Sequence, residues 1–232
     1  MSTARQIRTV LFDLDHTLFD TESSELAAFD ATLVSAGVVD PRRHLETYIS
    51  INRALWAGVE RGEVTPNEVA VARFVQLVAV LDLDADPHQL ADTFLGELGA
   101  NGDLYPGARA LIDRLAIDVE MALITNGVGR VQRDRLQRLG LADHFSAVVI
   151  SGEVGTSKPG TDIFDLTFRQ LGRPRRETAV MIGDSLTSDI RGGRDYGIAT
   201  CWYNPNHTTR GPNDDCTFEV HDLEDIAELL LG

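Results

Sequence analysis

Short apolar runs alternate with helical patterns over the second half of this 232-residue chain, and this alternation constrains the fold more than any other feature. Strands that alternate with helices form a parallel sheet with helices on both faces, so we expect a doubly wound α/β core. Five runs have the length and composition of buried strands, at 10–12, 119–124, 147–150, 178–182 and 198–202. Helical patterns precede the later four runs, at 108–116, 129–139, 161–172 and 187–196.

The interval between the first expected strand and the second has a different pattern. It contains no convincing strand and is a succession of helical segments, expected at 22–36, 41–60, 65–81 and 87–98. Tyr105-Pro106-Gly107 marks the return to the core, because Pro and Gly punctuate such boundaries. We therefore expect a core of residues 1–20 and 104–232, interrupted by a helical cap at 21–103. A final amphipathic helix is expected at 222–231.

Charge and cysteine content exclude several classes of function. The chain carries 36 acidic and 21 basic residues, a formal charge of −15, which repels a nucleic-acid backbone. Cys201 and Cys216 lack metal-ligand spacing, so we expect neither a zinc site nor a disulfide, and Cys201 is interpreted as a core residue. No apolar run is long enough to cross a membrane, so we expect a cytoplasmic protein with no membrane partner.

Polar residues follow the expected strands at the edge where parallel sheets bind ligands. Asp13 and Asp15 follow the first strand and point to the same side, which suits a hard cation or a nucleophile and acid pair. A solvated turn is the alternative interpretation. Thr125 and Asn126 follow the second strand and offer a hydroxyl and backbone N–H groups to an anion, although a simple turn and helix cap explains them too.

Two later segments add a cation and more carboxylates. Lys158 precedes a helix and can offer its charge to phosphate oxygens, although most single lysines lie at the surface. Asp184 follows the strand at 178–182 and is placed like a metal ligand, with Asp189 one turn later to orient it; a helix cap and an ordinary helix acid are the alternative. Each signal alone is modest. Together, at successive strand ends, they form the set that phosphoryl transfer needs.

These segments, Asp13-x-Asp15-x-Thr17, Thr125-Asn126, Lys158-Pro159 and Gly183-Asp184 to Asp189, resemble the four motifs of the haloacid dehalogenase (HAD) superfamily. The resemblance spans essentially the whole chain and implies a HAD-like Rossmannoid core with a small inserted helical cap. His16 replaces a glycine common in the family, at a variable position. Further segments resemble the pyrimidine 5′-nucleotidase branch, at 52–56, 73–74, 150–159 and 197–202.

The resemblance implies a mechanism. Asp13 is the nucleophile that forms an aspartyl-phosphate, and Asp15 is the general acid and base. Thr125, Asn126 and Lys158 bind the phosphate. Mg²⁺ is held by Asp13, the backbone carbonyl of Asp15, and Asp184. Two residues act behind these ligands, Thr17 and Asp189. In the cap, three residues are candidates for contacting the leaving group, Asn52, Arg53 and Trp56, although Trp56 is equally compatible with a buried cap core.

We therefore expect a Mg²⁺-dependent phosphomonoester hydrolase whose partner is a small phosphorylated metabolite, with pyrimidine nucleoside 5′-monophosphates as first choice. A phosphatase for another phosphoester such as a sugar phosphate, a phosphomutase and a non-catalytic scaffold are the alternatives. Dehalogenases of this superfamily lack an acid at the position of Asp15, so dehalogenation is disfavoured. The sequence does not distinguish a monomer from a homodimer.

Overall fold

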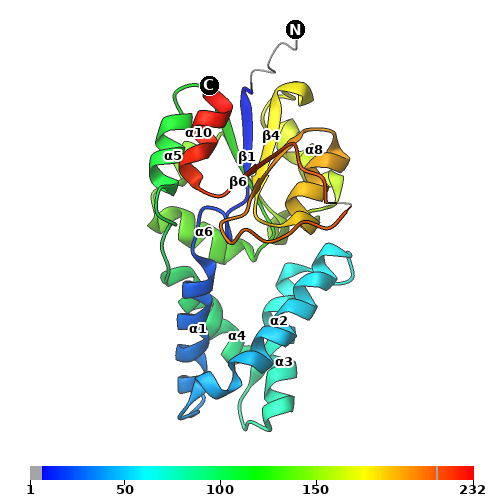
Figure 1. The fold of residues 1–232 in the computed structure, drawn as a ribbon. Coiled ribbons are helices and arrows are strands. Elements are labelled where there is room, and N and C mark those ends of the chain that lie inside the picture. The colour runs from blue at the N-terminus through cyan, green and yellow to red at the C-terminus, as the bar shows by residue number, and fades with distance from the viewer. Residues whose placement is uncertain (1–6, 213) are drawn as a thin grey trace.

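The core of the molecule is a six-stranded parallel sheet with the strand order β3-β2-β1-β4-β5-β6 (Figure 1). The computed structural model describes residues 7–212 and 214–232. β1 lies at the centre, where Phe12 is paired with Leu123 of β2 on one side and with Ile182 of β4 on the other. The strands are β1 Thr9–Phe12, β2 Glu120–Thr125, β3 Ala147–Ile150, β4 Ala179–Gly183, β5 Ala199–Tyr203 and β6 Phe218–Val220.

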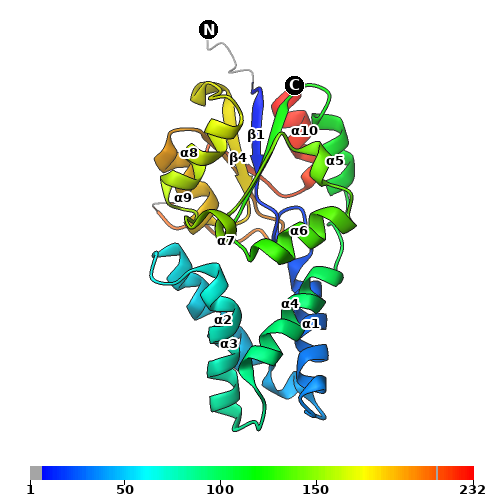
Figure 2. The ribbon, with the colours of Figure 1, turned by 180° about the vertical axis from the view of Figure 1, so that it is seen from behind.

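Helices cover both faces of this sheet, which confirms the predicted doubly wound α/β fold (Figures 1 and 2). Val10 and Phe12 face the core under α5 (Ala108–Leu115) and α10 (Leu223–Leu231). Leu11 faces the opposite core, under α8 (Thr161–Gln170) and α9 (Arg191–Tyr196). Alternate residues of a strand point to opposite faces, so a strand buried on both faces is apolar throughout. This is why the strands stand out in the sequence as continuous apolar runs.

Four helices form the cap below the carboxyl ends of the strands (Figure 1). They bury a core of their own, in which the rings of Phe29 and Tyr48 lie 4.8 Å apart and those of Phe74 and Phe94 5.3 Å apart. Residues at the helix ends determine where the helices begin. At the start of α3, for example, Thr65 and Glu68 form a capping box. The helices are α1 Thr21–Ser35, α2 Leu45–Glu60, α3 Pro66–Leu81 and α4 Pro87–Ala100.

The chain enters and leaves the cap through two segments that lie side by side. The Asp20 N–H donates to the Asp103 carbonyl at 2.9 Å, and the Tyr105 N–H donates to the Leu18 carbonyl at 2.9 Å. Gly102 has φ +89°, and a Cβ there would lie 2.6 Å from the Phe19 ring, so this connection requires glycine. The domain boundaries predicted at 20/21 and 103/104 remain a prediction.

Several sequence-based element predictions need correction. The single helix predicted at 41–60 is a 3₁₀ turn, Pro41–His44, followed by α2. The helix predicted at 187–196 is a π-helical turn, Leu186–Ile190, that leads into α9. β6 and the four-residue α7 (Ser151–Val154) were not predicted, because Glu219 interrupts the apolar run of β6 and a single helical turn shows no periodic pattern. Among the described residues, no helix is long and apolar enough to cross a membrane.

Candidate active site

Asp13 and Lys158 form the centre of the site. Asp13 directly follows β1, and its N–H still pairs with the Ile182 carbonyl of β4 at 2.9 Å, so the sheet fixes its backbone. Lys158 is 1% exposed, and its Nζ lies 2.5 Å from Asp13 Oδ1, 2.7 Å from Asp189 Oδ1 and 2.8 Å from the Ile124 carbonyl. Burial raises the pKa of Asp13 well above its usual value, and Lys158 opposes that rise. Burial alone would lower the pKa of Lys158, but Asp13 and Asp189 raise it overall, so the ammonium stays charged.

Asp184 lies on the other side of Asp13, at the end of β4. The Thr17 hydroxyl is 3.4 Å from both Asp13 Oδ2 and Asp184 Oδ1, and it accepts the Asp184 N–H at 3.1 Å. Burial and the neighbouring Asp189 raise the pKa of Asp184 to about 7. A Cβ on Gly183 would lie 2.2 Å from Asp189 Oδ2, so only glycine lets Asp189 approach the strand so closely.

The carboxylates of Asp13, Asp184 and Asp189 suit a hard divalent cation. One oxygen from each lies within 4.8 Å of the others. Carboxylate oxygen is the ligand type that Mg²⁺ prefers. With every group in its charged form, these three acids and Asp15 at the described strand ends outnumber the two cations, Lys158 and Arg135, by two. Besides burial, crowding of these carboxylates helps to raise the pKa of Asp13 and Asp184, which a bound cation would reverse. Both Asp189 oxygens are engaged, Oδ1 with Lys158 Nζ at 2.7 Å and Oδ2 as acceptor of the Ser185 N–H at 3.0 Å, whereas Asp13 meets Lys158 through Oδ1 only. Asp13 Oδ2 and Asp184 therefore supply the carboxylate oxygens left for a metal.

Asn126 and Thr125 have different surroundings. Asn126 Nδ2 donates to the Lys158 carbonyl at 2.8 Å, and its Oδ1 accepts the Lys158 N–H at 2.9 Å. This pair of bonds ties the Lys158 loop to the end of β2, so the Asn126 side chain holds the lysine in place. The Thr125 hydroxyl is fully buried and accepts a bond from Gln132 at 2.9 Å. Asn126 lines the cavity described below, whereas Thr125 is absent from its wall.

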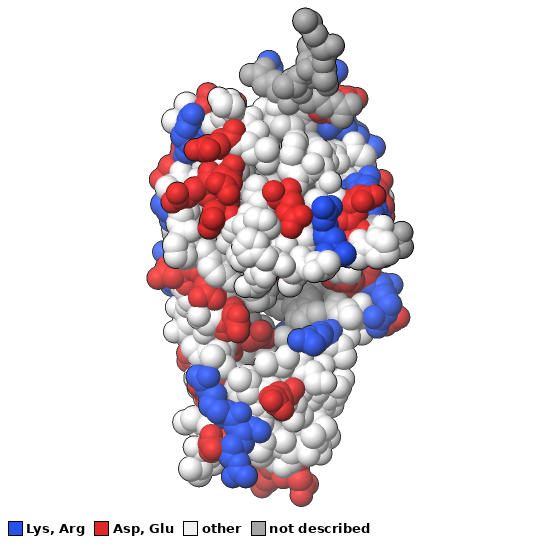
Figure 3. Space-filling model, viewed as in Figure 1, with Lys and Arg blue, Asp and Glu red and all other residues white. Residues whose placement is uncertain are grey.

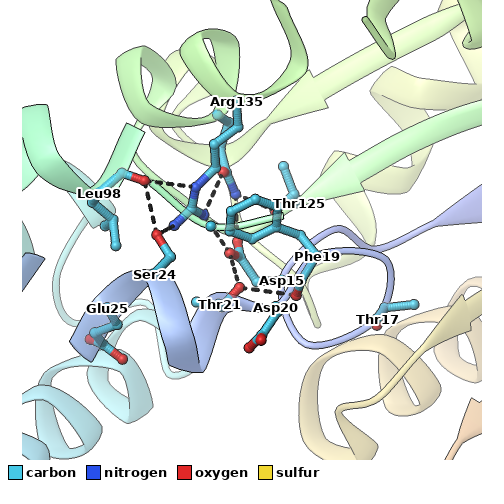
Figure 4. A network of polar contacts seen from close by, with 12 residues as sticks. Asp15, Thr17, Phe19, Asp20, Thr21, Ser24, Glu25, Leu98, Thr125 and Arg135 are labelled. Carbon is cyan, nitrogen blue, oxygen red and sulfur yellow. Dashed lines mark hydrogen bonds and ion pairs between the residues drawn. The ribbon is translucent and has the colours of Figure 1, made fainter. Parts of the chain in front are cut away.

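Asp15 is held by three donors (Figure 4). Thr21 Oγ1 donates to Oδ1 at 2.6 Å, Arg135 Nη1 to Oδ1 at 2.7 Å, and Gln132 Nε2 to Oδ2 at 2.5 Å. Burial alone would raise the pKa of Asp15, but Arg135 and the hydrogen bonds from Thr21 and Gln132 lower it overall. Gln132 and Arg135 come from α6 (Gly129–Arg138), which begins just after Asn126.

A cavity of about 330 Å³ lies between the strand ends and the cap, where the surface is hollowed (Figure 3). The cap contributes Asn52, Trp56 and Arg73 to its wall. Arg53, predicted beside Asn52 and Trp56, is exposed and is not part of the wall. The cap also contacts the core across this gap, because the Thr187 hydroxyl bonds to Glu60 Oε1 at 3.1 Å.

Sequence reasoning gave no role in the site to five residues that contact Asp15 or line the cavity: Thr21, Glu25, Arg73, Gln132 and Arg135. Gln132 and Arg135 are the clearest cases. They lie beside Val131 and Leu136 on the buried face of α6, so the signal was a pair of polar side chains at apolar positions of a helical pattern. Glu25 and Arg73 gave a similar signal in the cap. Arg73 is 2% exposed, and its Nη1 lies 3.2 Å from the Tyr48 hydroxyl and 3.9 Å from Glu25 Oε1.

Comparison with known proteins places this arrangement in a family. Residues 7–197 match the model of the haloacid dehalogenase-like hydrolases, and that span includes every strand-end residue described above. The chain belongs to this hydrolase family. The HAD-like hydrolase core and cap predicted from the sequence are thereby confirmed, and the protein is an enzyme of the hydrolase class.

Three relatives cover almost the whole chain. The pyrimidine 5′-nucleotidase PynA of Streptococcus pneumoniae is 35% identical, over 95% of this chain and 94% of its own. The pyrimidine 5′-nucleotidase YjjG of Escherichia coli is 32% identical, over 95% and 96%. The solved structure of the HAD-hydrolase YfnB of Bacillus subtilis, bound to magnesium, superposes with a TM-score of 0.89 at 32% identity, over 97% of this chain and 99% of that one.

Proposed function

We propose that this protein is a Mg²⁺-dependent phosphomonoester hydrolase that acts on pyrimidine nucleoside 5′-monophosphates through an aspartyl-phosphate on Asp13. The observation that carries the proposal is the placement of Asp13. Its carboxylate is fixed at the end of the central strand, contacts a charged lysine and faces the cavity between the strand ends and the cap. A carboxylate so placed can attack phosphorus while the neighbouring cation offsets the charge of the substrate.

Residues of this chain can carry out both steps of the reaction, the transfer of the phosphoryl group to Asp13 and the hydrolysis of the aspartyl-phosphate. An Asp13 oxygen bonds to phosphorus, the phosphorus–oxygen ester bond breaks, and the departing oxygen takes a proton from Asp15. Asp15 must first take up that proton from solvent, because Arg135 and the hydrogen bonds that Asp15 accepts hold the resting carboxylate ionised. A water oxygen then bonds to phosphorus, the bond to Asp13 breaks, and Asp15 accepts the proton of that water. Lys158 and the backbone N–H of Asn126 bind the remaining phosphoryl oxygens. Asp189 and Thr17 hold Lys158, Asp13 and Asp184 in place.

Mg²⁺ fits the residues that remain. Asp13 and Asp184 would hold it, together with the backbone carbonyl of Asp15. When bound, the cation neutralises phosphoryl oxygens and stabilises the charge that develops during transfer. The excess of negative charge at the strand ends, described above, supports a divalent cation over a monovalent one.

The cap side of the cavity supports a nucleoside as the leaving group. Trp56, Leu95 and Leu98 give it an apolar wall, which suits a planar base, and an indole can stack on one. Asn52 and Arg73 bring polar groups to the same wall, which suits the edge of a base. A sugar phosphate offers no planar ring to such a wall. The names of the relatives PynA and YjjG favour the same substrate class.

The test is phosphate release from a panel of esters, with Mg²⁺ and with a chelator. We expect release from UMP, dUMP and dTMP that requires Mg²⁺ and is much faster than release from glucose 6-phosphate or ribose 5-phosphate. Asp13→Asn, checked for folding by circular dichroism, is expected to abolish it. Release from sugar phosphates alone would reject the nucleotide assignment, isomerised product would indicate a phosphomutase, and full activity of folded Asp13→Asn would reject the mechanism.

A further inference from the structure

Arg135 is the most heavily engaged side chain near the site (Figure 4). It is 2% exposed. Its Nη1 donates to Asp15 Oδ1 at 2.7 Å, its Nε to the Leu98 carbonyl at 3.1 Å, and its Nη2 to the Ser24 hydroxyl at 3.3 Å. The guanidinium also lies over the Phe19 ring, with Cζ 4.2 Å from the ring centroid. Burying a guanidinium is costly unless it is hydrogen-bonded, and here each of its three nitrogens has an acceptor.

These partners belong to three different parts of the molecule. Asp15 is in the core loop after β1, Ser24 is in the first turn of α1, and Leu98 is in the last turn of α4. Ser24 closes the group, because its hydroxyl lies 3.1 Å from the Leu98 carbonyl and 3.1 Å from the Asn101 carbonyl. One side chain from the core helix α6 therefore contacts the general acid and both ends of the cap.

The cap could be anchored to α6 without the contact between Arg135 and Asp15. Arg138, one turn further along α6, also reaches the segment that returns from the cap, with Nη2 2.6 Å from the Gly102 carbonyl and 3.2 Å from the Asn101 carbonyl. Arg138 is exposed and makes no contact with Asp15 among the described residues. An exposed arginine thus provides the anchor, whereas the buried Arg135 adds the link to the acid.

We propose that Arg135 is a positioning residue that orients Asp15 and makes that orientation depend on where the cap lies. The inference rests on the proposed phosphatase function. When the cap moves against the core, Leu98 and Ser24 move with it while α6 and Asp15 stay with the sheet. Arg135 cannot then keep all of its bonds at their present lengths, so cap position and the placement of the acid change together.

Substrates with different leaving groups can show whether Arg135 positions the general acid or only supports the structure. Loss of a positioned acid slows only the ester whose leaving group needs a proton. A nucleoside leaves as an alkoxide and needs a proton, whereas p-nitrophenolate leaves without one. We expect Arg135→Met to lower kcat/KM for dTMP about 100-fold, the scale of general acid catalysis, and to change that for p-nitrophenyl phosphate less than about threefold. Arg135→Lys keeps the charge and is expected to lose less. Ser24→Ala removes the contact of Arg135 Nη2 with the cap and leaves the bond from Arg135 to Asp15 in place, so it should show a smaller loss of the same selective kind.

Arg138→Met is the matched control, because it removes bonds to the cap segment without touching Asp15, and it should show no selectivity for the leaving group. If Arg135→Lys and Ser24→Ala lowered kcat/KM for dTMP and for p-nitrophenyl phosphate by equal factors, the inference would be overturned. This result would count even if Arg135→Met failed to fold. A selective loss in Arg138→Met as large as in Arg135→Lys would overturn it too. If the wild-type protein hydrolysed neither ester, the proposed function itself would fall, and this inference with it.

Discussion

Lys158→Met removes one buried charge while it keeps most of the length and volume of the side chain. Three contacts of Nζ are lost, to Asp13, to Asp189 and to the Ile124 carbonyl. Counting each at about 1.5–3 kcal/mol would overestimate the effect, because the ammonium no longer has to leave water on folding. Breaking a buried ion pair from one side costs about 3–5 kcal/mol, since the partner carboxylates stay buried and unpaired. We expect a loss of that size in the free energy of unfolding at pH 7.

The effect of pH has a definite sign. Removing Lys158 raises the pKa of Asp13 further above its unfolded value, because only the cation opposed the effect of burial. A carboxyl group whose pKa is raised by folding stabilises the protein below its unfolded pKa, and this contribution is lost as pH rises through the folded pKa. The difference between wild type and variant should therefore be largest at pH 7 and smaller at pH 5.

Urea unfolding in a chelator, followed by tryptophan fluorescence, measures this difference. The chain has two tryptophans, so a Trp56→Phe background leaves Trp202 of β5 as the reporter for the core. Arg169→Met is the control: Arg169 also lies 2.7 Å from a carboxylate, that of Asp165, but both are solvent-accessible, so the loss should stay below about 1 kcal/mol. A loss below about 1 kcal/mol for Lys158→Met, or one equal at pH 5 and pH 7, would refute the reasoning.

Two further predictions concern the metal and the cap. Burial and Asp189 raise the pKa of Asp184 to about 7, and burial raises that of Asp13 as well, so protons on these ligands must leave before Mg²⁺ can bind. Affinity for Mg²⁺ should therefore fall at least about tenfold per pH unit below pH 7. Calorimetric titration at several pH values measures this, and a constant affinity from pH 5 to 8 would contradict it. Trp56→Ala should raise the KM for dTMP up to about tenfold through lost stacking, whereas exposed Arg53→Ala should not; equal KM values for the two variants would count against the stacking role.

The sheet and the strand-end residues were predictable because both depend on local pattern plus one geometric rule. A strand such as β1, which is buried on both faces, is rich in apolar residues. The first charged residue after the apolar run, Asp13, therefore marks where the strand ends. Parallel strands end at the same edge, so Asp13, Lys158 and Asp184 had to lie near one another whatever the details of packing. The structure adds that Lys158 contacts Asp13 and Asp189 at the same time.

The contacts of Asp15 with Gln132 and Arg135 could not be predicted, because these side chains are far away in the sequence. Arg135 is separated from Asp15 by 120 positions, and an arginine in a helix normally points to solvent. The residues that line the cap side of the cavity could not be predicted for a related reason. Nothing local distinguishes Trp56, which lines the cavity, from Arg53 on the outside of the same helix, until the packing of α2 against α3 fixes which face is turned inward.

The central position of β1 has a consequence for how the chain folds as it is synthesised. β1 is the first strand to be made and ends at Phe12, yet its two partners begin at Glu120 and Ala179. The innermost strand must therefore wait, unpaired, while the cap is completed beside it. All four cap helices are complete at Ala100, so the cap can close before Glu120 is made, whereas the sheet closes only by long-range pairing, which is slow. During that interval the apolar faces of β1 and the unpaired N–H and C=O groups along its edges are exposed to other chains, so nascent chains stalled before β4 should be the most prone to aggregate.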